Sequence, residues 1–277
     1  MSSSHKNRTN YSTKIIKQMN LNLSNKIIIV TGGAKGIGLG ICKVLAAEGA
    51  VPVIIGRADA DNQIAVKEIE AEGGKALSVI AELTNPEACK NAVDQVITLC
   101  GRIDGLINNA GVNDGVGLES GDYKKFVASI HKNLVHYYLM AQHALPELKK
   151  TKGAIVNIGS KTADTGQGNT SAYAASNGGR NALTREWAVE LLKYGIRVNS
   201  VIVAECYTPL YETWINTLEN PQQKLKEITA KIPLENRMTT AEEIANMVVF
   251  LLSDKSSHTT GQLIYVDGGY THLDRSL

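Results

Sequence analysis

The sequence lacks both a long apolar run and a strong excess of either charge. No stretch approaches the roughly 20 consecutive apolar residues that a helix needs to cross a bilayer. The formal net charge is only +2, so nothing indicates a basic groove for nucleic acid or a basic membrane-binding surface. We therefore expect a protein whose partners are neither membranes nor nucleic acids.

Cysteine is also scarce, and its four positions are scattered. No close pair of cysteines has metal-ligand spacing. Of the six histidines, His136 and His143 lie seven residues apart, but no carboxylate is spaced to complete a site with them. We predict no metal, buried free thiols and a reducing, cytoplasmic location. The cysteines are Cys42, Cys89, Cys100 and Cys206.

The rest of the composition is that of an ordinary globular chain. Its 277 residues are 43% hydrophobic and 20% charged, without an internal repeat or a low-complexity segment. The first 25 residues are polar and basic and have no apolar core, so they do not resemble a secretory signal. We expect residues 1–23 to form a flexible arm and residues 24–277 to form one domain.

Short β-branched runs alternate with longer helical patterns throughout this domain. The run Ile27-Ile28-Ile29-Val30 shows no polar alternation, which indicates a strand buried on both faces. The pattern predicts a Rossmann-type, doubly wound parallel sheet of about seven strands with helices on both faces. The expected strands are residues 26–31, 51–55, 76–80, 104–107, 154–157, 197–202 and 263–266. The expected helices are residues 36–48, 61–71, 86–99, 123–148, 172–192 and 241–252.

The segment 203–238 breaks this alternation. It contains Pro209, Pro221 and Pro233, and it follows the carboxyl end of a predicted strand. Ligands bind at that edge of such sheets, so the segment is a candidate lid or substrate loop. The alternative is a purely structural excursion.

A glycine-rich turn directly follows the first predicted strand and opens a helix. Gly32, Gly36 and Gly38, with Lys35 and Ile37, form the segment TGGAKGIG. Glycines let the backbone approach a pyrophosphate closely, and the helix N-terminus offers free N–H donors. Although glycine also simply makes turns, this position between strand and helix predicts dinucleotide binding.

The residues after the second strand bear on the choice of cofactor. NAD-selective sites place Asp or Glu there for the ribose 2′-hydroxyl, whereas this chain has Gly56-Arg57, with Asp59 slightly late. Arg57 and Lys35 could hold a 2′-phosphate by charge-assisted hydrogen bonds, which favours NADP over NAD. The alternative is that both are solvated surface charges and either cofactor binds.

From residue 24 to residue 270 the chain resembles the short-chain dehydrogenase/reductase family. The glycine turn is similar to its TGxxxGxG motif, and residues 108–111 are similar to its NNAG motif. Ser160 lies thirteen residues before Tyr173, which is the family's Ser–Tyr spacing. The resemblance makes Tyr173 the acid/base, Ser160 the group that positions the substrate oxygen, and Asn133 the residue that completes the proton relay.

The resemblance also implies binding residues and an assembly. Family members are dimers or tetramers, and helices 123–148 and 172–192 resemble the usual pairing helices, so we expect a homodimer or homotetramer. The implied cofactor residues are Gly32, Lys35, Gly36, Ile37, Gly38, Arg57, Glu82, Leu83, Asn109, Ala110, Gly111, Tyr173, Asn177 and Thr208.

Within the family, several segments look like the L-fucose dehydrogenase branch, whose members oxidise C1 of the sugar to a lactone. They are residues 111–119, 160–163, 166–170, 184–188, 208–211 and 266–275. The resemblance implies a sugar or another alcohol as substrate. A sugar needs several fixed polar partners, and Asn113, Gln167, Asn169 and Glu205 lie in loops at the expected edge. The alternative for each is an ordinary polar loop residue.

One departure lies at the expected catalytic centre. The family places Lys four residues after its Tyr, one helical turn away, but this chain has Asn177. Asn can hydrogen-bond ribose hydroxyls but carries no charge, so oxidation, which needs a phenolate, is predicted to suffer more than reduction. Arg180, seven residues after Tyr173, could restore the charge from the same helix face, unless it faces outward. Lys161, next to Ser160, is the other candidate cation.

A second departure follows the sixth strand, where the family usually has Pro-Gly and this chain reads Val203-Ala204-Glu205. The two departures leave two hypotheses open. The first is an active NAD(P)-dependent dehydrogenase with a coordinated variant of the centre. The second is a catalytically impaired, cofactor-binding homologue that acts as a sensor or structural partner, and Asn177 could also be an engineered change.

Overall fold

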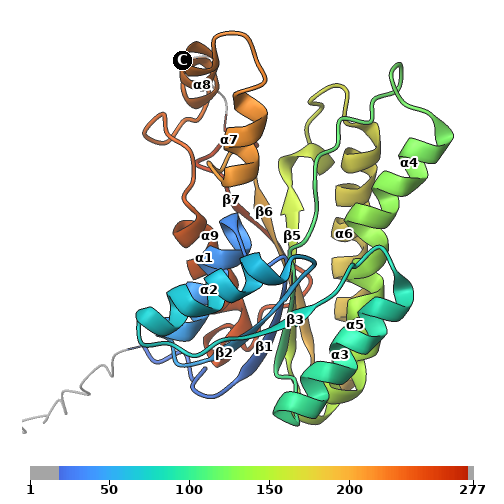
Figure 1. Ribbon diagram of the computed structural model, residues 1–277, viewed down its shortest axis with the longest axis vertical. Coiled ribbons are helices and arrows are strands. Elements are labelled where there is room, and N and C mark those ends of the chain that lie inside the picture. Colours follow the sequence, from blue (N-terminus) through green and yellow to red (C-terminus); the bar gives the residue numbers. More distant parts are fainter. Residues whose placement is uncertain (1–18, 274–277) are drawn as a thin grey trace, which may run out of the picture.

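The computed structural model describes residues 19–273, which form an α/β domain around one parallel sheet (Figure 1). The strand order is β3-β2-β1-β4-β5-β6-β7. The chain adds strands outward from β1 to β3 and then crosses to β4 on the other side of β1, as in doubly wound sheets. The prediction of a doubly wound parallel sheet of seven strands is confirmed. The strands are β1 (Ile27–Thr31), β2 (Val51–Gly56), β3 (Leu77–Ile80), β4 (Gly105–Asn108), β5 (Ala154–Ser160), β6 (Arg197–Val203) and β7 (Leu263–Val266).

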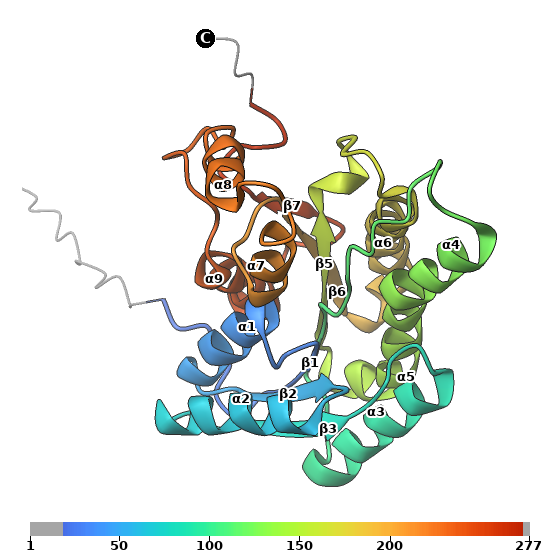
Figure 2. The ribbon, with the colours of Figure 1, turned by 45° about the horizontal axis from the view of Figure 1, so that its top comes forward.

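Helices cover both faces of the sheet (Figures 1 and 2). One face carries α1, α2 and α9, and the other carries α3, α5 and α6. The helices are α1 (Gly36–Ala47), α2 (Asp59–Ala71), α3 (Pro86–Cys100), α4 (Tyr123–Ile130), α5 (His136–Thr151), α6 (Ser171–Glu190), α7 (Pro209–Ile215), α8 (Pro221–Thr229) and α9 (Ala241–Leu252). The short turns are η1 (His131–Val135), η2 (Lys161–Ala163), η3 (Leu192–Tyr194) and η4 (Asp254–Ser256).

Strand β1 shows why the apolar runs carry no alternation. Ile28 and Val30 pack in the cluster with α1 and α9, while Ile29 packs in the opposite cluster with α3 and α5. All three side chains are at most 1% exposed. Burying an apolar residue on each face stabilises the sheet from both sides, as the sequence pattern predicts.

The expected single helix over residues 123–148 is wrong in detail. It is divided into α4 and α5 by a π-helical turn at η1, and α5 continues to Thr151. A π turn inserts one residue into the helical repeat, which the spacing of apolar residues does not reveal. Asn133, one of the expected relay residues, sits within this turn.

The segment 203–238 is partly helical and not an open loop. Both of its helices begin at a proline, Pro209 in α7 and Pro221 in α8, because proline at the first helical position needs no hydrogen-bond partner for an N–H. In both views α7 lies above α1, at the end to which β5 points, and α4 and α6 lie across the sheet (Figures 1 and 2). The segment therefore borders the carboxyl edge of the sheet.

Most of the predicted N-terminal arm lies outside the described residues. Of the arm, residues 19–23 are described, and Leu23 is 4% exposed and packs in the core cluster with α1 and α9. No helix in residues 19–273 is long and apolar enough to cross a membrane.

Candidate active site

The glycine turn between β1 and α1 has a backbone that larger residues do not fit. Gly32 and Gly36 have φ values of +64° and +54°, which favour glycine. A Cβ at Gly38 would lie 2.1 Å from the carbonyl oxygen of Gly32. Helix α1 begins at Gly36, and the side chain of Lys35 at its N-cap makes no capping hydrogen bond. The turn therefore folds tightly at the N-terminus of α1, where the N–H groups of a helix suit a pyrophosphate.

Expected cofactor residues from two other segments contact this turn. Asn109 Nδ2 donates to the carbonyls of Thr31 and Gly32 at 2.9 and 3.2 Å, and Ala110 N donates to Thr31 Oγ1 at 3.1 Å. A Cβ at Gly36 would lie 3.2 Å from Thr208. The structure thus brings the NNAG segment and the start of α7 to the glycine turn.

The two cations expected at the adenosine end both lie near carboxylates. Lys35 Nζ is 2.8 Å from Asp61, and Arg57 Nη1 is 3.9 Å from Glu82. The Arg57 side chain is 81% exposed and that of Lys35 is 61% exposed, so each can reorient toward a ligand. Leu83 instead packs at the cluster with α3 and α5.

The Ser160 hydroxyl stands at the carboxyl end of β5 and is oriented by its neighbours. Its Oγ accepts hydrogen bonds from Thr162 Oγ1 at 3.1 Å and from Thr162 N at 3.3 Å. Tyr173 is half-buried in the first turn of α6, which packs against the turn that carries Thr162. Ser160 and Tyr173 therefore come from adjoining elements.

Asn177 connects the elements that carry Tyr173 and Ser160. Its side chain is fully buried. Nδ2 donates to the Tyr173 carbonyl at 2.9 Å and to Thr162 Oγ1 at 3.5 Å, while Oδ1 accepts from Arg180 Nη1 at 3.0 Å. The amide is thus engaged by protein groups on both sides.

Arg180 is buried, so the outward-facing alternative is wrong. The residue is 3% exposed, and its guanidinium carbon lies 4.2 Å from the ring centre of Tyr137 and 6.0 Å from that of Tyr173. Nε donates to the Asn133 carbonyl at 2.7 Å, and Nη1 donates to the Ile158 carbonyl at 3.1 Å. No Asp or Glu within residues 19–273 forms an ion pair with it. Among the described residues, Arg180 is therefore a buried cation of this centre that has no carboxylate partner.

Asn133 holds the segment that follows β4. Its Nδ2 donates to the carbonyls of Val112 and Ser129 at 2.9 and 3.0 Å, and its Oδ1 accepts from Val112 N at 2.8 Å. A Cβ at Gly111 would lie 2.9 Å from both Asn133 Oδ1 and Arg180 Nη2. Only glycine lets this segment pass so close to the two polar groups.

The two aromatic neighbours of Arg180 are uncharged at neutral pH. Burial, followed by the Arg180 charge, lowers the pKa of His136 to about 4. Burial raises the pKa of Tyr137 to about 12, despite the opposing effect of Arg180. Neither side chain therefore changes its charge near neutral pH.

The other candidate cation, Lys161, is neutralised by a partner. Its ammonium pairs with the Glu205 carboxylate and lies 3.9 Å above the Tyr270 ring centre. Burial, followed by Glu205, raises the pKa of Tyr211. Glu205, expected as a substrate ligand, is thus held in an ion pair with Lys161.

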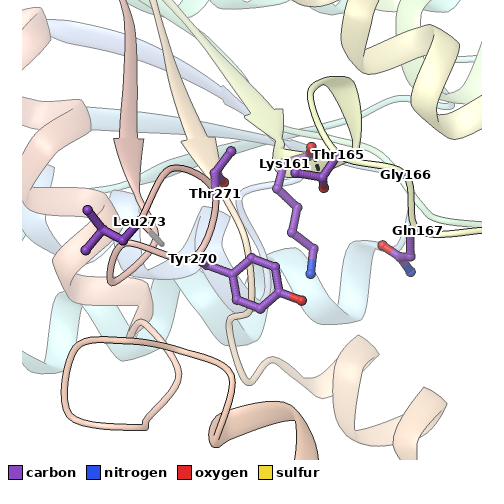
Figure 3. Close-up of a pocket in the computed structure, with 7 residues that line it drawn as sticks. All are labelled: Lys161, Thr165, Gly166, Gln167, Tyr270, Thr271 and Leu273. Carbon is purple, nitrogen blue, oxygen red and sulfur yellow. Dashed lines mark hydrogen bonds between the residues drawn. The ribbon is translucent and has the colours of Figure 1, made fainter. Parts of the chain in front are cut away.

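Lys161 borders a cavity of about 500 Å³ beside the end of β5. Figure 3 shows the ammonium of Lys161 between the ring of Tyr270 and the side chain of Gln167. Of the expected substrate residues, only Gln167 lines this cavity. The lining residues are Lys161, Thr165, Gly166, Gln167, Tyr270, Thr271 and Leu273.

Two other expected substrate residues, Asn113 and Asn169, do not line this cavity. Asn113 is exposed and accepts from Gly115 N at 3.4 Å, and Asn169 is exposed with a φ of +53°. Sequence reasoning missed Thr162 and Tyr270. The first depends on a 3₁₀ turn and the second on the return of the C-terminal segment, and neither leaves a spacing signal.

Comparison with known proteins identifies the family. A family model described as enoyl-(acyl carrier protein) reductase matches residues 32–271. The 3-oxoacyl-[acyl-carrier-protein] reductase FabG of Thermotoga maritima is 35% identical over 251 residues, which cover 90% of this chain and 99% of that protein. The chain belongs to the short-chain dehydrogenase/reductase family. The predicted family and enzyme class are confirmed: it is an oxidoreductase that acts on CH–OH groups, in a family that uses NAD(P).

Two further dehydrogenases resemble the chain over most of its length. The L-fucose dehydrogenase of Bos taurus is 31% identical over 252 residues, which cover 91% of each protein. The crystal structure of Cj0485 dehydrogenase is 44% identical, covers 94% of this chain and 99% of that chain, and superposes with a TM-score of 0.88.

Proposed function

We propose that the protein oxidises C1 of L-fucose or a related aldose to a lactone, with NADP preferred over NAD. The observation that carries the substrate class is the cavity of about 500 Å³ lined by Lys161, the residue that follows Ser160. Its volume is typical of small-molecule sites. Lys161, Thr165, Gln167 and Tyr270 line it with polar groups, as a ligand with several hydroxyls requires. The likeness to an L-fucose dehydrogenase supports the same class.

The residues that would hold the dinucleotide are those of the glycine turn, the NNAG segment and Thr208. The turn fits the group, because the positive φ of Gly32 and Gly36 and the close packing at Gly38 admit only glycine and fold the backbone tightly at the start of α1. When bound, the nicotinamide supplies a hydride acceptor for alcohol oxidation or a hydride donor for carbonyl reduction.

Ser160 and Tyr173 divide the remaining chemistry between them. The Ser160 oxygen already accepts from Thr162, so its own O–H is available to donate to the substrate oxygen. The phenol oxygen of Tyr173 takes the proton from the substrate hydroxyl during oxidation and returns it during reduction. Asn133 and Asn177 hold the surrounding backbone and helix in place.

The NADP preference depends on Lys35 and Arg57. A 2′-phosphate would compete with Asp61 and Glu82 for these exposed cations. Calorimetric titration of the purified chain is expected to give about tenfold tighter binding of NADP⁺ than of NAD⁺. The double substitution Lys35→Ala, Arg57→Ala should remove this difference in affinity. The control is Lys43→Ala in α1, which should preserve it. Equal affinities in the unsubstituted chain would contradict the preference.

We further propose that the chain forms a homodimer or homotetramer through the outer faces of α4, α5 and α6. These faces expose Tyr123 (80%), Phe126 (39%), Tyr138 (48%) and Val189 (70%). Covering such apolar surface with a second copy is favourable. Light scattering should give two or four times 29.8 kDa, and Val189→Glu should lower that mass. A monomer at all concentrations would contradict the assembly.

We propose a cytoplasmic location from the state of the cysteines. All four are free, and Cys42, Cys89 and Cys206 are buried. Burial raises the pKa of the Cys89 thiol to about 11, which keeps it unreactive. Cell fractionation tests the location, and recovery of the protein outside the cytoplasmic fraction would contradict it.

The activity is tested by nicotinamide absorbance with a panel of substrates. L-fucose and other aldoses, simple secondary alcohols and a 3-oxoacyl thioester are each supplied with NAD or NADP. Turnover with an aldose supports the proposal, and turnover only with the thioester or simple alcohols refutes the sugar assignment. Tight cofactor binding without any turnover would favour the sensor or structural role.

A further inference from the structure

Burying the Arg180 guanidinium without a carboxylate partner costs free energy. It is 3% exposed, and its attraction to the Tyr137 ring is weaker than an ion pair with a carboxylate. Its Nη2 is buried with no hydrogen-bond partner, on the side that faces Gly111. Removing such a cation from water without a counter-ion is unfavourable, and an apolar side chain of similar length would avoid that cost.

A continuous set of hydrogen bonds leads from this cation to the Ser160 hydroxyl. Arg180 Nη1 donates to Asn177 Oδ1 at 3.0 Å, and Asn177 Nδ2 donates to Thr162 Oγ1 at 3.5 Å. Thr162 Oγ1 in turn donates to Ser160 Oγ at 3.1 Å. Every donor therefore points from the cation toward Ser160, which fixes the orientation of each group.

Arg180 also ties together the elements around Tyr173. Its Nε bond to the Asn133 carbonyl anchors the π turn, and its Nη1 bond to the Ile158 carbonyl anchors β5. The same guanidinium lies 6.0 Å from the Tyr173 ring centre.

We propose that Arg180 is a positioning residue of the acid/base centre. It supplies the buried positive charge near Tyr173 and, through Asn177 and Thr162, orients the Ser160 hydroxyl. This inference rests on the proposed roles of Tyr173 and Ser160. It identifies Asn177 as the uncharged partner that a buried guanidinium requires beside it.

The other titratable groups around Arg180 do not supply this charge. On α5, His136 and Tyr137 are both uncharged, with pKa values of about 4 and about 12. On η1, Lys132 pairs with Asp114 at 3.4 Å. On η2, Lys161 pairs with Glu205. The remaining cation on α6 is Arg185, which is exposed.

The inference makes residues 177 and 180 interdependent. A lysine at 177 would place a second buried cation where Oδ1 now accepts from Arg180. Asn177→Lys alone is therefore expected to lower the Tm by about 5 °C or more, a shift typical of repulsion in a chain of this size. Adding Arg180→Met removes the repulsion, so the double variant melts close to Arg180→Met alone. Arg185→Met is the matched control and leaves the Tm within about 2 °C.

Thermal unfolding of these four variants needs no substrate, so its result is independent of the proposed reaction. Tm shifts that add in the double variant would refute the coupling between residues 177 and 180. Absence of turnover with any substrate would count against the proposed function and leave this cycle interpretable.

The effect on the acid/base centre is tested by turnover. Arg180→Met should lower kcat at least about tenfold while KM changes little, and Arg180→Lys should keep most of the activity. Arg185→Met, the matched control, should change neither constant. An unchanged kcat in a folded Arg180→Met variant would overturn the proposal.

Discussion

Arg180 Nη1 donates a hydrogen bond to Asn177 Oδ1 across 3.0 Å, inside helix α6. The contact explains why an uncharged side chain occupies the position one turn after Tyr173. A cation is already present one further turn along the helix, and the two sites are too close for both to be charged. What looks in the sequence like the loss of a charge is, in the structure, a displacement of it.

The glycine turn gives the first prediction. A Cβ at Gly38 would lie 2.1 Å from the Gly32 carbonyl oxygen, so Gly38→Ala must displace the turn. We expect the affinity for NADP⁺ to fall at least about tenfold, or about 1.4 kcal/mol, in calorimetric titration. Gly178→Ala, at a helical glycine with open space around it, is the control. Unchanged affinity in Gly38→Ala would mean that the cofactor does not bind at this turn.

Gly111 gives a second prediction, because its missing side chain makes room for Arg180. A Cβ there would lie 2.9 Å from Arg180 Nη2 and from Asn133 Oδ1. Gly111→Ala is expected to lower kcat at least about tenfold and to lower the Tm by several degrees, as overpacking does. The measurements are steady-state kinetics and thermal unfolding. Wild-type values of both would show that the contact with Arg180 is unimportant.

His136 predicts a pH dependence of stability. Its pKa is about 4 in the folded protein against an ordinary value of 6.5, so the unfolded chain binds the proton more tightly. The contribution of His136 to stability is therefore complete above about pH 6.5 and declines as the pH falls toward about 4. The full loss is about 3 kcal/mol.

The measurement is urea unfolding at about pH 7 and about pH 4.5. His136→Gln cannot gain a proton, so its unfolding free energy should fall less between the two values. If both proteins lose the same stability on acidification, His136 is not the group responsible.

The pair of Lys161 and Glu205 gives a fourth prediction. Both side chains are buried, at 8% and 13% exposed, so Lys161→Met leaves a carboxylate without its cation. Unfolding free energy should fall by about 3 kcal/mol, and adding Glu205→Gln should restore most of it. Lys125→Met, which removes an exposed pair with Asp122, should cost less than about 1 kcal/mol. Additive losses in the double variant would indicate that the two side chains act independently.

Much of the fold could be predicted from local pattern. Apolar runs such as Ile27–Val30 indicate burial on both faces, and the strand, glycine turn and helix order identifies the phosphate-binding edge. The π turn at His131–Val135 could not be predicted in this way, because one inserted residue changes the helical register without changing the apolar spacing.

The orientation of Arg180 could not be predicted from the sequence, for a different reason. Helix α6 buries a polar stripe that includes Ser176, Asn181 and Thr184 as well as Asn177 and Arg180, so hydrophobic periodicity does not mark its inner face. Lys161 and Glu205 are 44 residues apart in the sequence. They pair because each follows the carboxyl end of one of two neighbouring strands, β5 and β6.

The central claim is that Tyr173 performs acid/base chemistry on an alcohol. The most direct measurement compares the unsubstituted chain with Tyr173→Phe, using L-fucose and saturating NADP⁺ at alkaline pH, with cofactor affinity determined for both. The account predicts that removing the phenol oxygen lowers kcat by at least about a hundredfold while NADP⁺ binding stays unchanged. Equal turnover by the two proteins would contradict it.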